Sequence, residues 1–284
     1  MERVTPARAW KRITTADGSW TLEHPEHGEA CHSRYGAWME ARERYCIPCH
    51  LEELAGERDE LRLLDVGTGL GLNIAAALEV TRRARTLLRV VTLERSPDVI
   101  RTAIELGLEA PSRATDDEAA EAAAELHGLV LRTLARALEA PGEELPFEGP
   151  SELGTLRLVL GDARETLPAL EPETRFDLCF LDPFSHRKEP ELWMPDFLRA
   201  VADRLDQGGW LSTYSASIRV RAGLLAAGLS VGLGPRVAKK AAGTVARRGA
   251  ALPTFEPRIE KRVQRAAEEL RNGTNAMDER SPST

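Results

Sequence analysis

A short apolar strand, a glycine-rich turn and an apolar helix follow one another in this chain, and that order restricts the fold more than any other feature. Leu61–Val66 is predicted to be a buried strand and Leu72–Glu79 an apolar helix. Gly67, Gly69 and Gly71 lie between them at alternate positions. Glycines at a strand-to-helix turn let the backbone bend sharply and let a ligand approach the main-chain amides. The chain is therefore predicted to have an α/β fold with a ligand site at this turn.

The spacing of these glycines is G-x-G-x-G, and it differs from the G-x-G-x-x-G of a dinucleotide-binding fold. With Asp65 two residues ahead of the first glycine, the stretch resembles the first motif of class I S-adenosylmethionine (SAM) methyltransferases. The resemblance implies a Rossmann-like, mostly parallel, seven-stranded sheet with helices on both faces. It also implies that the turn contacts the cofactor, with Asp65, Thr68 and Asn73 beside the glycines. The alternative is a purely structural turn in an α/β domain.

Acidic residues follow three further predicted strands, at the strand ends where open α/β sheets bind their ligands. The strands are 87–93, 156–160 and 176–181, and they are followed by Glu94, by Asp162 with Ala163, and by Asp182. A carboxylate at Glu94 can accept hydrogen bonds from both hydroxyls of a ribose, and one at Asp162 can accept a bond from an adenine amino group. Asp182 can orient an attacking amine or accept its proton. In each case the alternative is a carboxylate that only holds a turn.

A second resemblance covers roughly residues 12–250. The segment from Phe176 to Trp193 is similar to the signature of the MnmC-type tRNA methyltransferase family, and residues 29–41 and 212–228 are similar to two further motifs of that family. These enzymes methylate the aminomethyl group on the wobble uridine of certain tRNAs, which completes 5-methylaminomethyl-(2-thio)uridine. The resemblance therefore implies a SAM-dependent N-methyltransferase whose partner is tRNA.

The roles known in the family carry over to the positions that match its motifs. Asp182 and Phe184 would be the catalytic pair facing the aminomethyl uracil, and the glycine turn, Glu94, Asp162 and Ala163 would hold SAM. The resemblance also implies substrate contacts from Glu29, His32, Ser33, Tyr35, Lys188, Trp193, Lys239 and Lys240.

Two positions depart from the family pattern. Pro183 stands between Asp182 and Phe184 where the family has a small residue, and this change would reshape the acceptor pocket. Lys239-Lys240 stands where the family has a Lys-Arg pair followed by a Met, which weakens the inference of tRNA contacts there. The bifunctional family members carry an added flavin oxidase domain. A chain of 284 residues is too short for one, so another enzyme is expected to make the aminomethyl precursor.

The composition is that of a globular protein, with 42% hydrophobic and 29% charged residues. No apolar run approaches membrane-spanning length, and the first twelve residues lack the apolar core of a secretion signal, so we expect no membrane contact and a cytoplasmic location. The net charge of −7 argues against a general nucleic-acid coat. Residues 207–255 nevertheless contain no acid, and their cations form either a phosphate-contacting face or a scattered solvated set. These cations are Arg219, Arg221, Arg236, Lys239, Lys240, Arg247 and Arg248.

The four cysteines are predicted to be reduced thiols, with no metal site. Cys46-Ile-Pro-Cys49-His50 has the letters of a haem-attachment motif, but that chemistry needs an exported chain. A zinc site would need a second clear ligand pair, and Cys31-His32 is the one pair on offer.

We expect three parts in the chain. Residues 1–60 would form a β-hairpin, turning at Asp17-Gly18, and a helix that pack on the core. Residues 61–250 would form the methyltransferase domain, with a helical insertion at about 109–154. Residues 251–284 would form a charged helix ending near Arg271 and then a disordered tail.

Two other functions remain open at this point. The chain could methylate a small-molecule or protein amine, because Pro183 alters the acceptor motif and the protein is acidic. It could also be a non-catalytic SAM-fold protein that binds tRNA or another partner through its acidic insertion at 109–152 and its basic segment at 207–255. The oligomeric state is not predictable from these residues.

Overall fold

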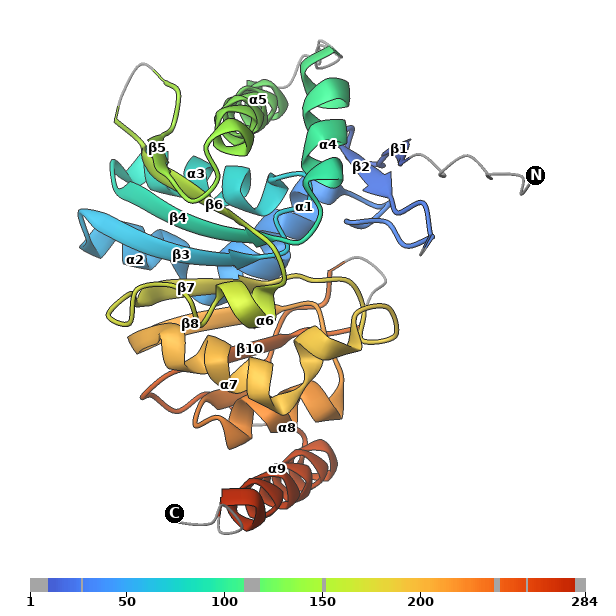
Figure 1. The fold of residues 1–284 in the computed structure, drawn as a ribbon, viewed down its shortest axis with the longest axis vertical. Helices are drawn as coiled ribbons and strands as arrows, with labels where there is room; N and C mark the ends of the chain where they lie inside the picture. The colour runs from blue at the N-terminus through green and yellow to red at the C-terminus, as the bar shows by residue number, and fades with distance from the viewer. Residues whose placement is uncertain are drawn as a thin grey trace.

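The chain folds around one eight-stranded sheet, with helices packed against both faces (Figure 1). The computed structural model describes residues 10–26, 28–109, 118–149, 152–237, 241–253 and 255–278. In spatial order the strands are β5 (Glu144–Pro146), β6 (Gly154–Leu160), β4 (Leu87–Glu94), β3 (Glu60–Val66), β7 (Phe176–Leu181), β8 (Leu205–Thr213), β10 (Thr244–Arg247) and β9 (Ser230–Leu233).

The five central strands, from β6 to β8, are parallel, whereas β5 and β10 pair antiparallel with their neighbours. The sheet is therefore mostly parallel, as predicted, but it has eight strands instead of seven. The added strand is β5, which lies within the segment that we expected to be a helical insertion. Pro146 lacks an amide hydrogen, and a proline of this kind is tolerated because β5 lies at the sheet edge.

Successive residues of β3 serve two hydrophobic cores, one on each side of the sheet. Leu61 and Leu63 pack in the first core, while Leu64 and Val66 pack in the second. This alternation follows from the period of two in a strand. The helices are α1 (Ala37–Ala41), α2 (Leu51–Glu57), α3 (Leu72–Ala84), α4 (Pro97–Glu109), α5 (Glu118–Glu139), α6 (Ala163–Thr166), α7 (Pro195–Arg204), α8 (Ile218–Ala226) and α9 (Pro257–Asp278).

The N-terminal part begins with the predicted hairpin, in which β1 (Lys11–Thr14) and β2 (Trp20–Glu23) pair antiparallel. After α1 the chain makes a π-helical turn, η1 (Arg42–Cys46), and a 3-10 turn, η2 (Ile47–Cys49), before it enters α2. In Figure 1 the hairpin lies beside the edge of the sheet where the parallel strands end.

The insertion contributes to the main core. Leu126, Val130 and Leu134 of α5 are fully buried, as their helical spacing predicts, and α5 packs against α3 and α4. In the C-terminal part, α9 continues to Asp278. The prediction of disorder from residue 272 is therefore wrong for residues 272–278. Among the described residues, no helix is both long enough and apolar enough to cross a bilayer.

Candidate active site

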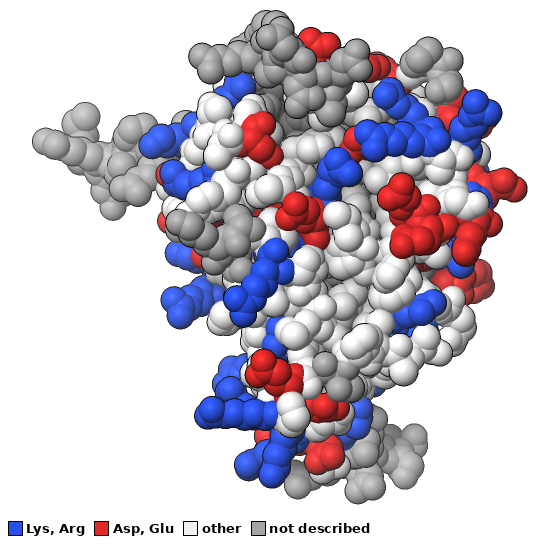
Figure 2. All heavy atoms as spheres, turned by 180° about the vertical axis from the view of Figure 1, so that it is seen from behind, with Lys and Arg blue, Asp and Glu red and all other residues white. Residues whose placement is uncertain are grey.

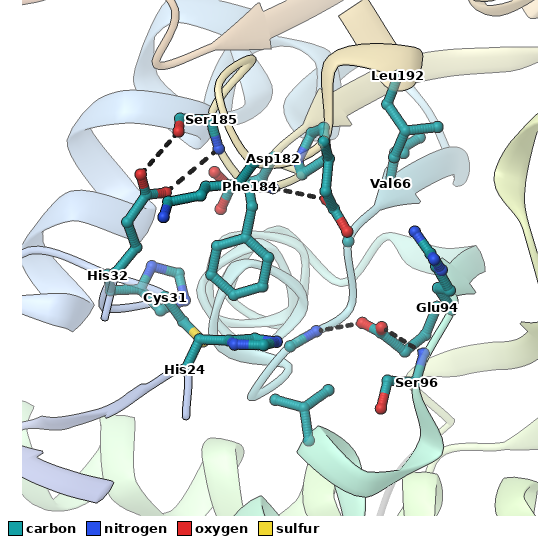
Figure 3. Close-up of a pocket in the computed structure, with 18 of the residues that line it drawn as sticks. His24, Cys31, His32, Val66, Glu94, Ser96, Asp182, Phe184, Ser185 and Leu192 are labelled. Atoms are coloured by element: carbon teal, nitrogen blue, oxygen red, sulfur yellow. Dashed lines mark hydrogen bonds between the residues drawn. The ribbon is translucent and has the colours of Figure 1, made fainter. Parts of the chain in front are cut away.

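A cavity of about 850 Å³ opens where the parallel strands end (Figure 3). Its walls come from the ends of β3, β4, β6, β7 and β8 and from the N-terminal hairpin region. Its lining includes Gly67, Gly69 and ten more of the predicted site residues: Glu29, His32, Ser33, Tyr35, Glu94, Asp162, Ala163, Asp182, Phe184 and Lys188. Segments far apart in the sequence therefore meet in one pocket.

All three glycines of the turn have positive φ angles, 94° at Gly67, 51° at Gly69 and 72° at Gly71, a region that favours glycine. Gly67 and Gly69 line the cavity. Gly71 does not line the cavity. It packs against the insertion instead, where a Cβ atom would lie 2.9 Å from Val130. Its place in the motif therefore reflects close helix packing.

Glu94, at the end of β4, lines the cavity beside the glycine turn (Figure 3). It accepts hydrogen bonds from the main-chain amides of Gly69 (3.1 Å) and Ser96 (2.9 Å). Burial raises the pKa of Glu94, and these amide bonds act against that shift. The side chain is thus fixed beside the turn, in a position where a ligand ribose could donate to it.

Three predicted cofactor residues lie behind the cavity wall, since Asp65, Thr68 and Asn73 are buried and do not line it. The hydroxyls of Thr68 and Thr92 lie 2.6 Å apart, and Thr92 donates to Asp65 at 2.7 Å. This chain of hydrogen bonds ties the glycine turn to β4. Burial raises the pKa of Asp65 to about 8, with the charges of Asp182 and Glu94 adding to the shift.

Replacing Asp65 with asparagine is expected to stabilise the protein at neutral pH. The ordinary pKa of an aspartate is 3.8, so the unfolded chain releases a proton that folded Asp65 keeps up to about pH 8. Unfolding of the native protein should therefore become easier as pH rises from about 4 to 8, by up to about 1.4 kcal/mol per pH unit. Asp65→Asn should lack this loss, and the two proteins should converge near pH 4. Urea unfolding across that range measures the difference, and parallel curves would contradict the assignment.

Asp162 lies at the end of β6 as predicted, and it caps α6 by accepting from the main-chain amide of Arg164 (2.9 Å). The Arg164 guanidinium also donates to this carboxylate and lowers the pKa of Asp162. Asp162 is therefore ionised and ordered, and the preceding Gly161 amide donates to the Glu94 carbonyl at 2.9 Å, which places Asp162 near Glu94 in the lining.

Asp182 follows β7 and is tied to the floor of the cavity. Its Oδ2 atom accepts a hydrogen bond from Asn73 Nδ2 at 2.9 Å, and the buried phenol of Tyr45 also bonds to the carboxylate. Asn73, predicted as a cofactor contact, therefore bonds to the carboxylate that was predicted to face the acceptor, and it does not line the cavity. The Tyr45 ring is positioned by the π-helical turn η1 and packs on Phe180 at 5.5 Å between ring centroids.

The loop after Asp182 is held by side chains from several elements. Tyr214 donates to the Pro183 carbonyl at 2.9 Å, and the Trp193 indole donates to the Phe184 carbonyl at 2.8 Å. Glu189 accepts from the Phe184 amide at 3.0 Å. Pro183 takes part in the loop through its carbonyl, which accepts the bond from Tyr214 and does not require an amide hydrogen.

Trp193 itself is buried behind the wall and does not line the cavity, in contrast to the predicted substrate contact. It lies in the 3-10 turn η3 (Pro190–Trp193), and its ring meets Tyr214 edge-on at 5.7 Å. The geometry makes Trp193 a support for the loop that carries Phe184.

The N-terminal part closes one side of the cavity. Glu29 accepts a hydrogen bond from Ser185 Oγ at 2.7 Å, which joins this part to the loop after β7 (Figure 3). The Ser33 amide donates to the buried Glu40 carboxylate at 2.6 Å. His32 is buried in the wall, whereas Tyr35 is 48% exposed. Lys239 and Lys240 lie outside the described residues.

Several lining residues were not predicted, notably Trp10, His24, Glu189 and Tyr214. The sequence signal for Tyr214 was its place after a strand, at the same sheet edge as the other site residues. Trp10 and His24 flank the hairpin, and no local pattern predicts that the hairpin folds over the cavity.

The cavity is strongly acidic, since eight acidic side chains line it against three basic ones. A site of this kind favours cationic ligands. The acids are Glu26, Glu29, Glu40, Glu94, Asp162, Asp182, Glu189 and Glu191, and the cations are Arg34, Arg95 and Lys188.

The cysteines do not form a reactive cluster. All four are free thiols, and burial raises the pKa of each of them above its ordinary value. Thiols in this state are protonated and poorly nucleophilic. Among the described residues, no group of three or more His, Cys, Asp or Glu side chains has the geometry of a metal site.

Comparison with known proteins identifies similar chains. Residues 124–249 match the model of a family described as S-adenosyl-L-methionine-dependent methyltransferases. The crystal structure of MnmC2 from Aquifex aeolicus superposes with a TM-score of 0.72 at 31% identity, covering 91% of this chain and 77% of that one.

Two curated relatives match most of this chain. The "tRNA 5-methylaminomethyl-2-thiouridine biosynthesis bifunctional protein MnmC" of Delftia acidovorans is 31% identical over 251 residues, which are 85% of this chain and 35% of that protein. An uncharacterized protein of Methanocaldococcus jannaschii is 26% identical over 245 residues, 86% of this chain and 60% of that protein. The chain thus spans about one third of the former relative's length and three fifths of the latter's.

Proposed function

The chain belongs to the MnmC-type family of SAM-dependent methyltransferases, and we propose that it methylates the aminomethyl group of 5-aminomethyl-(2-thio)uridine at the wobble position of tRNA. The observation that carries the proposal is the contact between the two halves of the pocket. A Cβ atom on Gly67 would lie 2.7 Å from the Asp182 carbonyl, so the predicted cofactor turn and the predicted acceptor loop touch.

The cavity suits SAM in shape and in charge. Gly67 and Gly69 line the cavity without side chains, so a ligand can approach the main chain closely there. The Glu94 carboxylate suits a ribose, and Asp162 suits an adenine amino group. The acidic lining suits the positive charge of the cofactor. When bound, SAM supplies an activated methyl group.

The residues of the chain would then position the amine and remove its proton. An amine attacks only in its neutral form, and the Asp182 carboxylate can accept an N–H bond or the proton itself. Asn73 and Tyr45 orient that carboxylate from behind. Phe184 offers an aromatic surface beside it, on which a uracil ring can stack. Most of the rate gain would come from holding the two reactants in line.

The partner in this proposal is tRNA, supplied with its aminomethyl group by another enzyme, and the setting is the cytoplasm. On the left of Figure 2, the side on which the β1–β2 hairpin lies when the molecule is seen from behind, Lys and Arg side chains are frequent, while Asp and Glu gather on the right. Basic side chains on the hairpin side of the molecule would fit the phosphates of a tRNA whose cationic amine enters the acidic cavity. Lys239 and Lys240 remain proposed contacts.

A small-molecule or protein amine is the second candidate, favoured by the acidity of the pocket and by Pro183. One experiment separates the candidates. Labelled methyl from SAM is supplied to tRNA from a strain lacking this methylation, and the digested nucleosides are identified by mass. Label in 5-methylaminomethyl-uridine species supports the proposal. Confirmed SAM binding without label in tRNA would overturn it and favour other amines, while tight tRNA binding without turnover would indicate a binding protein.

Replacing Glu94 with glutamine is expected to weaken SAM binding by about tenfold to hundredfold, because a hydrogen bond to a charged group contributes about 1.5–3 kcal/mol. The rate at saturating SAM should change little, since Glu94 does not touch the acceptor side. Calorimetric titration with SAM measures the effect. Asp98→Asn, which removes an exposed carboxylate in the first turn of α4, is the matched control and should bind normally. Equal affinity in both variants would remove Glu94 from the cofactor site.

A further inference from the structure

Three aromatic rings form a row along the wall of the cavity. Phe184 and His24 meet edge to face, with centroids 5.1 Å apart and planes at 84°. His24 and Trp10 meet in the same way, at 4.6 Å and 71°. All three residues line the cavity, and Figure 3 shows the His24 ring directly beside the Phe184 ring. The row therefore continues the acceptor wall beyond Phe184 toward the N-terminal hairpin.

The rings in this row are held in place. His24 Nδ1 accepts a hydrogen bond from the Glu26 amide at 3.1 Å, which fixes the plane of the imidazole. The main chain of Phe184 is fixed on both sides, by Trp193 and by Glu189. Trp10 is half-buried and packs against the first hydrophobic core. Fixed, partly open aromatic rings lose little entropy when a flat ligand stacks on them.

The cavity is large for a small-molecule site. Its volume of about 850 Å³ lies near the upper end of the roughly 300–1,000 Å³ typical of small-molecule sites. Methylation of a base within a folded RNA requires an unstacked nucleotide, and proteins hold such nucleotides by stacking the neighbouring bases on aromatic side chains. If the target base stacks on Phe184, His24 and Trp10 are the next aromatic rings along the wall.

We propose that Trp10 and His24 form a second nucleobase subsite, which takes the base next to the methylated uridine in a single-stranded RNA loop. This inference rests on the proposed function, and it assigns the neighbouring base a stacking contact that tolerates any base identity. Phe184 contacts the target base, His24 separates the two positions, and Trp10 provides the outer stacking surface.

The test uses a stem-loop RNA with 5-aminomethyluridine in its loop, together with two versions that are abasic at the nucleotide before or after it. Removing one stacked base should raise KM about fivefold to hundredfold. Trp10→Ala should raise KM for the complete stem-loop to a similar degree, without changing SAM affinity. In Trp10→Ala, the abasic substitution at the nucleotide that occupies the subsite should raise KM no further. Trp10→Phe, which keeps a ring, should retain most of the activity on the complete stem-loop.

The outcomes separate the two proposals. If the native protein does not methylate the complete stem-loop, the proposed function fails. If it does, but an abasic nucleotide before or after the target raises the KM of Trp10→Ala by the same factor as it raises the KM of the native protein, the subsite is wrong. Loss of SAM binding in Trp10→Ala would indicate damage to the fold. Trp10→Leu, tested with the same complete and abasic stem-loops, would then decide whether the subsite exists.

Discussion

Asp182→Ala is expected to lower the rate of methyl transfer by about 10²–10⁴-fold, the usual contribution of a positioned acid or base, while SAM affinity changes less than about threefold. The Asp182 side chain lines the cavity on the side that we propose for the acceptor, and its bonds to Asn73 and Tyr45 orient the carboxylate without involving the glycine turn. Single-turnover rates and equilibrium SAM binding measure the two quantities separately.

Asp182→Asn and Asn73→Ala refine this result. Asparagine keeps the shape of Asp182 but cannot take a proton, so a large loss in that variant assigns the proton to the carboxylate. Asn73→Ala removes one orienting hydrogen bond and should cost less, about tenfold, because Tyr45 still holds the side chain. A parallel fall in turnover and SAM affinity in Asp182→Ala would instead make Asp182 a structural residue of the cofactor site.

The parts of the site that were predictable lie at strand ends. The β3 turn, Glu94 and Asp182 each follow a short apolar strand, and parallel strands bring their carboxyl ends to one edge. Local pattern and sheet topology therefore suffice to bring these residues together. The same reasoning counted one strand too few, because β5 is three residues long and includes a proline.

The parts that were not predictable depend on contacts between distant segments. Gly71 meets Val130 of the insertion, and Trp193 turns its indole away from the cavity toward the Phe184 carbonyl. Trp10 and His24 reach the pocket only because the hairpin packs over it. Side-chain direction in such cases is set by tertiary packing, which no periodicity in the sequence encodes.

The tight contact at Gly67 couples the two halves of the site. The Gly67 amide donates to the Leu93 carbonyl at 3.0 Å, and the Asp182 amide donates to the Val66 carbonyl at 2.9 Å. The main chains of β3, β4 and β7 therefore meet at one residue. A side chain at this position would disturb the cofactor turn and the acceptor loop at once.

Gly67→Ala is accordingly expected to abolish SAM binding and methyl transfer and to destabilise the fold by about 3 kcal/mol or more. The positive φ of 94° costs about 1–2 kcal/mol for any other residue, and the Cβ atom would press on the Asp182 carbonyl, adding about 1–3 kcal/mol. Gly142→Ala is the matched control, because its φ of 87° imposes the same strain while nothing lies within 4 Å of the added carbon. Thermal unfolding and SAM titration of both variants isolate the contact. If the two variants lose equal stability and both bind SAM, the close approach of Gly67 to Asp182 has no role in the site.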